Sequence, residues 1–343
     1  MLKKKPVAWL SLLLAFGLVA AACSNDDKAT DATGGGVAEG GVPECLTSAD
    51  LYAIFGAESA DVATWEDAQG LATELGSTTE LPTGELQIFG PGTESGTYDA
   101  FIELGLTDLA EERTQEPTVG VSYTSSPDDN SIVDGVAGAD NSLGWVGFAF
   151  AESAGDEVRE LQIAGEDGTC VSPEVDTIAS GEYPLSRPLF IYVNAANLAN
   201  KPELAAFVDL YLGDGYSSVS EAGYVELPAE LLAAAKAALA DAGVEVGQTS
   251  GLSGEIVVSG SSTVEPITNL VGEQFLAENG DVALSVDGPG TGDGFELFCA
   301  GETDISNASR AIKDEEAAAC TAAGVKYLEL QIGLDGITVL TKG

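Results

Sequence analysis

The chain has 343 residues, of which 13 are basic, 56 are acidic and none is histidine, so its formal net charge is −43 at pH 7. Such an acidic protein is a poor partner for nucleic acid or anionic lipid, and a chain without histidine lacks the base of a Ser-His-Asp triad. Its 45% hydrophobic content favours a folded protein over an acidic disordered one.

The first 23 residues have the pattern of an export signal. Three lysines at positions 3–5 precede an apolar run over 7–22, which is too short for a permanent membrane span, and small residues lead to Cys23. A cysteine at this place resembles the lipobox of bacterial lipoproteins, and an ordinary signal with an incidental cysteine is the alternative. Residues 24–41 are predicted to form a flexible tether. We therefore expect a lipid-anchored, extracytoplasmic protein, periplasmic or on the cell surface.

Helices and strands alternate beyond the tether, which predicts the α/β class and, at about 300 mature residues, two lobes over 42–185 and 186–343. Expected helices are 49–55 (capped by Thr47 or Ser48), 173–180, 202–212 and 228–242; expected strands are 85–89, 144–150, 161–163 and 187–193. After a linker over 244–253, a second α/β unit is expected, with strands 255–258 and 282–286, helices ending near 278, 298 and 322, and strands ending at 341.

Four cysteines remain beyond the signal: Cys45, Cys170, Cys299 and Cys320. An even number in an exported protein predicts two disulfides. Counting does not give the pairing, but Cys299 and Cys320 enclose a compact stretch and the other two lie in another region, so pairing within each region is favoured. The spacings match no zinc pattern, and neither a metal nor another cofactor is expected.

Four turns combine hydroxyl groups with the start of a helix or with a guanidinium. They are residues 93–97 (TESGT), 260–263 (GSST), 290–294 (GTGDG) and 307–310 (NASR). Hydroxyls and unpaired N–H groups at a helix N-terminus favour an anion, and the fork of Arg310 matches a tetrahedral oxyanion. Helix capping explains any one turn equally well, but four in one chain predict an oxyanion site.

Other motifs fit the sequence less well. The turn DGPGTGDG lacks the spacing of a dinucleotide-binding loop, no phosphate-binding P-loop is present, and TESG is not a nucleophile elbow. The acidic run over 128–135 misses the order of calcium ligands in an EF-hand. We therefore expect no enzyme activity; a secreted phosphoryl-transfer enzyme would need a nucleophile with a base, or a metal site.

The motifs SGSSTVEP, VDGPGTGDGFELF, ISNASRAI, GTESGTYDAF, NSLGWVGFAF and YPLSRPLFIYV together resemble the phosphate-binding proteins of phosphate-specific ABC transporters. The resemblance covers nearly all of the chain from Cys45. It implies a two-lobed periplasmic-binding-protein-like fold with inorganic phosphate in the interlobe cleft. It also implies the permease subunits of an ABC importer as partners, and we expect a monomer. A binding protein for another tetrahedral oxyanion and a phosphate sensor without transport are the alternatives.

The resemblance also implies which residues bind the ligand. They are Ser95, Gly96, Thr97, Ser262, Thr263, Val264, Thr291, Gly292, Ser309 and Arg310. Two positions depart from the family: Pro91 stands where well-known members have arginine, and Ser309 where many have aspartate. We infer that Arg310 supplies the missing cation. Asp293 or Glu94 is expected to accept the proton of hydrogen phosphate, which would disfavour sulfate.

Segment order is the largest departure. In the family, the segment resembling 254–343 comes first and continues into the one resembling 42–243, so this sequence looks circularly permuted, with a misassembled gene model as the alternative. Circular permutation is tolerated where the original termini lie close together. We expect strand 336–341 to lie beside strand 187–193. We also expect the permutation to leave one covalent crossing between the lobes and to widen the ligand-free opening.

Overall fold

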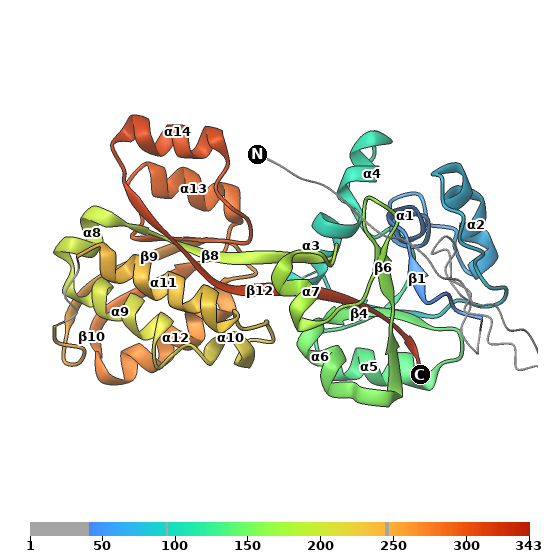
Figure 1. Ribbon diagram of the computed structural model, residues 1–343, viewed down its shortest axis with the longest axis horizontal. Coiled ribbons are helices and arrows are strands. Elements are labelled where there is room, and N and C mark those ends of the chain that lie inside the picture. Colours follow the sequence, from blue (N-terminus) through green and yellow to red (C-terminus); the bar gives the residue numbers. More distant parts are fainter. Residues whose placement is uncertain (1–40, 94, 244–246) are drawn as a thin grey trace, which may run out of the picture. The chain divides into compact units, whose positions relative to one another are not determined.

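The computed structural model describes residues 41–343 except Glu94 and residues 244–246. The predicted signal, Cys23 and nearly all of the predicted tether lie outside these residues. Helices and strands alternate through the described chain (Figure 1), so the predicted α/β class is confirmed. Within this part of the chain, no helix combines the length and the apolar character needed to cross a membrane.

The first group of elements is built on three parallel strands and is called the β9 lobe here. Strand β9 (Ser253–Gly260) lies between β10 (Asp281–Asp287) and β11 (Ile305–Ala308). Helix α12 (Glu265–Glu278) joins β9 to β10, and α13 (Thr291–Cys299) joins β10 to β11. Because the strands are parallel, their carboxyl ends and the turns that follow them lie at one edge of the sheet.

The second group repeats this arrangement and is called the β2 lobe. Strand β2 (Ile88–Pro91) lies between β4 (Leu143–Gly147) and β3 (Thr124–Ser126), all parallel. Helix α3 (Gly96–Gly105) follows β2, and α5 (Asp129–Gly138) follows β3. The buried Trp145 of β4 stacks on Phe101 of α3 and packs edge-on against Phe55, which fixes α3 on the sheet.

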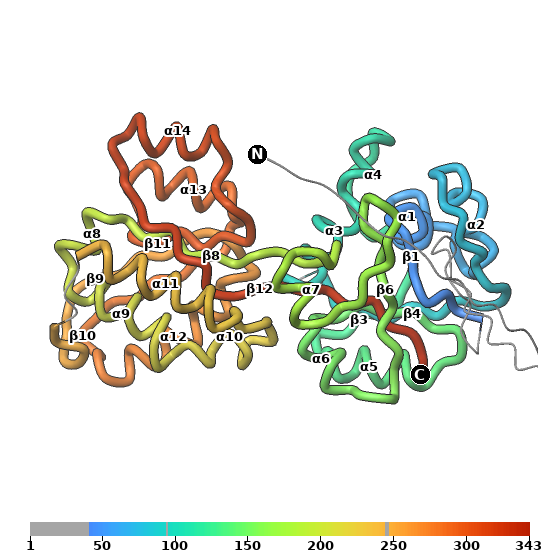
Figure 2. Tube along the Cα trace, viewed as in Figure 1, coloured from blue at the N-terminus to red at the C-terminus, as the bar shows by residue number. Residues whose placement is uncertain are grey.

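Two long strands connect the lobes, and one of them, β12, pairs with strands of both. Strand β12 (Tyr327–Lys342) pairs with β8 (Ser186–Asn194) over Tyr327–Gly336, then with β4 over Ile337–Leu340 and with β5 (Val158–Glu160) over Leu340–Lys342. Strand β8 also pairs with β11. In Figure 2, β12 is the red segment that passes close to β8 and then continues to the C-terminus.

These pairings correct three expectations. The prediction that residues 336–341 lie beside 187–193 was wrong, because the residues before Gly336 take that place. The prediction of a single covalent crossing was also wrong, since β8 and β12 both cross without interruption. Residues 337–342 hydrogen-bond to the β2 lobe, so not all of 186–343 belongs to one lobe.

The remaining elements cover the two sheets. They are α1 (Ser48–Phe55), α2 (Trp65–Glu74), α4 (Thr107–Glu112), α6 (Phe148–Ala154), η1 (Gly155–Glu157), α7 (Val175–Ser180), α8 (Ala195–Asn200), α9 (Pro202–Leu212), α10 (Ser218–Glu221), α11 (Ala229–Asp241) and α14 (Asp314–Ala323). Thr47 caps α1 in a capping box, as expected. The predicted strand 144–150 was wrong in its second half, because Phe148 already begins α6.

Both disulfides connect elements of one lobe. Cys45 of β1 (Cys45–Leu46) is bonded to Cys170 of β7 (Cys170–Val171), on either side of β6 (Gln162–Ala164). Cys299 of α13 is bonded to Cys320 of α14. The predicted pairing within each region is therefore confirmed.

Candidate functional site

Helix α3 presents its N-terminus beside the β9 lobe. Ser95 is the N-cap residue, and its hydroxyl accepts a hydrogen bond of 3.2 Å from the backbone N–H of Thr97. A methyl group placed on Gly96 would lie 3.4 Å from the Cα atom of Thr263. The helix start and the turn after β9 are therefore in contact, which brings predicted site residues of the two lobes together.

The turn after β9 is shaped by Gly260. This residue has a φ of +144°, and a Cβ atom there would lie 2.1 Å from the carbonyl oxygen of Asn307, so a side chain is excluded. The next residue, Ser261, donates its backbone N–H to that same oxygen at 2.9 Å. The turn ends at Thr263 and Val264, which are buried, and Ser262 is half-buried.

The starts of α13 and of the segment after β11 join this turn. The backbone N–H of Gly290 donates to the carbonyl oxygen of Gly260 at 2.9 Å. The hydroxyls of Thr291 and Ser309 lie 3.1 Å apart, and the N–H of Ser309 lies 3.3 Å from Thr291 Oγ1. Three of the four predicted turns thus meet in one lobe, and the fourth, with Gly96, faces them.

A buried cation that the sequence analysis did not assign lies at the same place. Arg187 of β8 donates from Nη2 to Thr263 Oγ1 at 3.0 Å and from Nε to Asp335 Oδ2 at 3.1 Å, and its Nη1 pairs with Glu103 of α3. Burial acts to lower the pKa of Arg187, but the carboxylates of Asp335 and Glu103 outweigh it and raise the pKa. The guanidinium is therefore permanently charged and fixed in position.

Arg310 has different partners from those expected of a ligand residue. Its guanidinium forms two bonds with the Glu316 carboxylate, at 2.8 and 2.9 Å, and lies over the Phe295 ring at 5.7 Å. The pKa of Arg310 is raised, first by the bond to Glu316 and to a smaller extent by Glu103. Arg310 thus lies within electrostatic reach of the same α3 carboxylate as Arg187, but its fork is occupied by Glu316.

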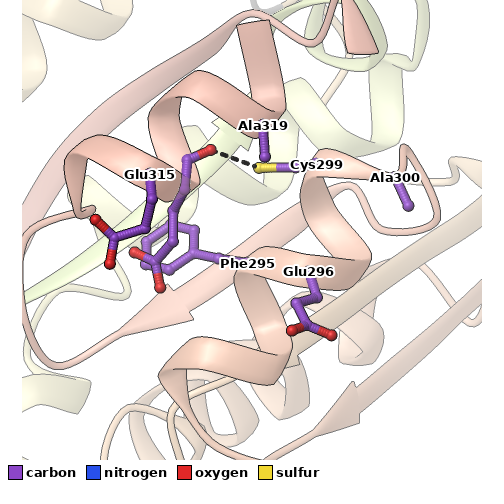
Figure 3. Close-up of a pocket in the computed structure, with 7 residues that line it drawn as sticks. Phe295, Glu296, Cys299, Ala300, Glu315 and Ala319 are labelled. Carbon is purple, nitrogen blue, oxygen red and sulfur yellow. Dashed lines mark hydrogen bonds between the residues drawn. The ribbon is translucent and has the colours of Figure 1, made fainter. Parts of the chain in front are cut away.

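A pocket of about 400 Å³ lies between α13 and α14 (Figure 3). Phe295, Glu296, Cys299 and Glu315 line it, together with Glu316. The Cys299 sulfur lies 3.4 Å from the Glu316 carbonyl oxygen, a packing contact, because a disulfide sulfur has no proton to donate. None of the hydroxyl-bearing turn residues lines this pocket.

Of the two carboxylates predicted to accept a ligand proton, the structure describes only one. Asp293 is exposed on the first turn of α13, and Glu94 lies outside the described residues. The face of α3 that begins at Gly96 carries Asp99 and Glu103 instead. The pKa of Asp99 is raised by burial and by Glu103, and Arg187 opposes this.

Sequence reasoning missed Arg187, Asp335 and Glu103. One signal was present: Arg187 stands at the start of one β-prone apolar run and Asp335 lies inside another, and opposite charges in such runs are typical of a buried pair. As for metals, the described side chains include no group of three or more His, Cys, Asp or Glu residues able to hold an ion.

The comparison with protein families agrees with this architecture. The model of the PBP superfamily domain matches residues 10–214 and 245–342. The chain therefore belongs to the PBP superfamily.

The individual relatives each match only about half of this chain. Protein SphX of Synechococcus elongatus is 33% identical over 55% of this chain and 52% of its own length. The phosphate-binding protein PstS of Staphylococcus saprophyticus is 43% identical over 53% of this chain and 50% of its own. The chain spans about half the length of these curated relatives.

One solved structure extends the fold comparison. The phosphate-binding protein of a phosphate ABC transporter from Streptococcus pneumoniae matches 76% of this chain and 90% of its own, with a TM-score of 0.55 and 24% identity. At this identity the likeness concerns the fold alone, and it agrees with the two-lobed periplasmic-binding-protein-like architecture.

Proposed function

We propose that this protein captures inorganic phosphate outside the cytoplasm and delivers it to the permease of an ABC importer, without catalysis. The observation that carries the proposal is the contact between Gly96 at the N-terminus of α3 and Thr263 in the turn after β9. A helix N-terminus and a hydroxyl turn from opposite lobes form an anion site when they face each other. The name of the PstS relative, a phosphate-binding protein, supports phosphate as the anion.

The proposed ligand residues fall into two sets. From the β2 lobe come Ser95, Gly96 and Thr97; from the β9 lobe come Ser262, Thr263, Val264, Thr291, Gly292, Ser309 and Arg310. The net negative charge of the chain does not oppose this, because distant charges are screened by salt and local donors dominate. If Arg310 binds the ligand, its guanidinium must contact the ligand and Glu316 at the same time.

Calorimetric titration tests the proposal directly. Phosphate should bind with 1:1 stoichiometry and arsenate should compete, whereas sulfate and molybdate should bind much more weakly. Asp293→Asn should raise the affinity for sulfate relative to phosphate if Asp293 accepts the ligand proton. Absence of any heat with phosphate, in a protein whose thermal unfolding is cooperative, would contradict the function itself.

Lipid anchoring through Cys23 and the tether over 24–41 belong to the same proposal. Mass spectrometry of the membrane fraction from the native host should find a diacylated N-terminal peptide that begins at Cys23. Replacing Cys23 by Ser should release the protein from the membrane without changing phosphate binding.

We also propose that the permuted order is genuine. Arg159 donates to the carbonyl oxygen of Val42 at 3.1 Å, and Thr341 lies opposite Arg159 in the β12–β5 ladder. The backbone N–H of Gly343 donates to Glu157 at 3.1 Å. The two segment ends that are continuous in the family thus both contact residues 157–159. A sequence comparison that requires the same segment order in both chains can match only one of two exchanged segments. A permuted order would therefore give matches over about half of each relative, as found for SphX and PstS.

A further inference from the structure

Arg187 uses only part of its hydrogen-bonding capacity. A guanidinium has five N–H donors in a fixed plane. In Arg187 one donates to Asp335, one to Glu103 and one to Thr263. The other two, one on each Nη, have no partner among the residues that the structure describes. They belong to a side chain that is 6% exposed, so bulk water does not satisfy them freely.

The bond from Arg187 also determines the direction of a neighbouring proton. Thr263 Oγ1 accepts from Nη2 at 3.0 Å, and a hydroxyl that accepts from a cation must point its own proton elsewhere. Thr263 is 2% exposed, and within the described chain its hydroxyl proton has no acceptor. A Cβ atom placed on Gly96, at the start of α3, would lie 3.6 Å from this Oγ1 atom.

The two carboxylates hold this arrangement in place before any ligand arrives. Asp335 is buried with Arg187, whereas Glu103 is about half-exposed. A buried cation needs such partners to remain charged, and together they fix the plane of the guanidinium. A donor fixed in advance loses less conformational entropy on binding than a flexible surface side chain.

We propose that Arg187 anchors the oxyanion in this site: its two remaining N–H groups bind ligand oxygens, and its bond to Thr263 turns that hydroxyl proton toward the same ligand. Arg187 would then be the principal cation of the site, because it is bonded directly to the turn residue Thr263, whereas both terminal nitrogens of Arg310 are bonded to Glu316 and one of them also to the Ala311 carbonyl oxygen. This assignment rests on the proposed function and names the residue on which it depends.

The first test compares arginine-to-lysine changes at two places. Arg187→Lys keeps a positive charge beside Asp335 but removes the fork, and it should weaken phosphate binding roughly thirtyfold or more, because it loses two charge-assisted contacts. Arg113→Lys is the matched control, since Arg113 pairs with Glu58 and Glu74 at the surface, away from the site residues. It should leave the affinity within about twofold. A wild-type affinity in folded Arg187→Lys protein overturns the proposal.

The second test asks whether Arg187 acts through Thr263. Thr263→Ser keeps the hydroxyl and should bind phosphate nearly as the parent does, whereas Thr263→Val should lose roughly tenfold. In the double variant of Arg187→Lys and Thr263→Val, the fold-loss of phosphate affinity should be much smaller than the product of the two single losses. Fully multiplicative losses overturn the positioning role. Equal affinities of Thr263→Ser and Thr263→Val overturn it as well, and this comparison stands even if Arg187→Lys does not fold.

The same titrations separate this inference from the proposed function. If the parent protein binds neither phosphate nor arsenate, the proposed function fails. If the parent binds phosphate and Arg187→Lys binds it equally well, only the role of Arg187 fails. Thermal unfolding of each variant, measured without ligand, distinguishes lost binding from lost structure.

Discussion

Arg187 and Asp335 lie directly opposite each other on β8 and β12, the two strands that connect the lobes, and their buried side chains form an ion pair of 3.1 Å. The pair therefore connects the two crossing strands at the point where the guanidinium also reaches Thr263. Removing one charge of such a buried ion pair leaves the other charge buried without that counter-charge, which is destabilising. Stability and the geometry of the site thus depend on the same contact.

Asp335→Asn should lower the free energy of unfolding by about 3 kcal/mol, because Arg187 then keeps only the half-exposed Glu103 as a charged partner. Urea unfolding followed by circular dichroism measures this. Asp140→Asn is the control, since Asp140 pairs with Lys342 at the surface with its side chain 88% exposed. The control should change stability by less than about 1 kcal/mol. Equal effects of the two changes would show that the buried pair has no special weight.

The second prediction concerns Arg310 and Glu316. If Arg310 contributes to the oxyanion site, Arg310→Ala should weaken phosphate binding by roughly tenfold. Glu316→Gln should tighten binding, because it removes the carboxylate that holds the Arg310 fork at 2.8 and 2.9 Å. Calorimetry on both variants decides between a ligand role and a structural one. Unchanged affinity in both would assign Arg310 to the packing of α14 against Phe295.

The sequence was sufficient for features that depend on neighbouring residues. Thr47 caps α1 as expected, because a capping box needs only residues three positions apart. The glycine- and hydroxyl-rich turns were located because each one directly precedes a helix or follows a strand. Pairing of the cysteines was also predicted, although Cys45 and Cys170 are 125 residues apart, because each pair of cysteines falls in its own region of the sequence.

Features that depend on distant pairing were not predictable in the same way. Arg187 and Asp335 are separated by 148 residues, and only the register of β8 with β12 places them together. The length of β12 was also missed, because its pairing shifts between Gln331 and Gly333 and then changes partner from β8 to β4. The sequence analysis expected more than one strand here, whereas pairing with β8 and then with β4 makes one continuous strand.

A third prediction concerns the dependence of stability on pH. Burial, and then the charges of Glu152 and Glu174, raise the pKa of Glu160 to about 7 from an ordinary value of 4.5. The folded state therefore holds a proton that the unfolded state has lost between these two values, and Glu160's contribution to stability decreases as pH rises from about 4.5 to 7.

Glu160→Gln should remove this decrease. At pH 8 the variant should melt higher than the parent by an amount on the order of 1–2 °C, a modest shift because Glu160 is only partly buried and solvent screens its charge. At pH 4.5 the melting temperatures should be nearly equal, since the parent carboxyl is then protonated in the folded state. A constant difference across this pH range would mean that Glu160 affects stability through packing and not through its charge. Calorimetric scans in buffers of equal ionic strength measure the profile.

The last prediction concerns the permuted order. Joining residue 343 to residue 42 and opening the chain within 244–253 would restore the order of the family. If the permuted chain had only one covalent crossing between the lobes, as expected from the sequence, rejoining would narrow the ligand-free opening and tighten phosphate binding. In the structure, β12 runs through both lobes and β8 connects them. The junction lies at the end of β12, where Arg159 of β5 donates to the Val42 carbonyl oxygen and the Gly343 N–H donates to the Glu157 carbonyl oxygen. The hinge strands are therefore the same in either order, and the fraction of molecules able to close should not change. We expect the rejoined protein to bind phosphate within about twofold of the parent, and its small-angle scattering without ligand to match. A clearly tighter affinity together with a more compact ligand-free state would show that the junction at β5 loosens the hinge despite both crossings.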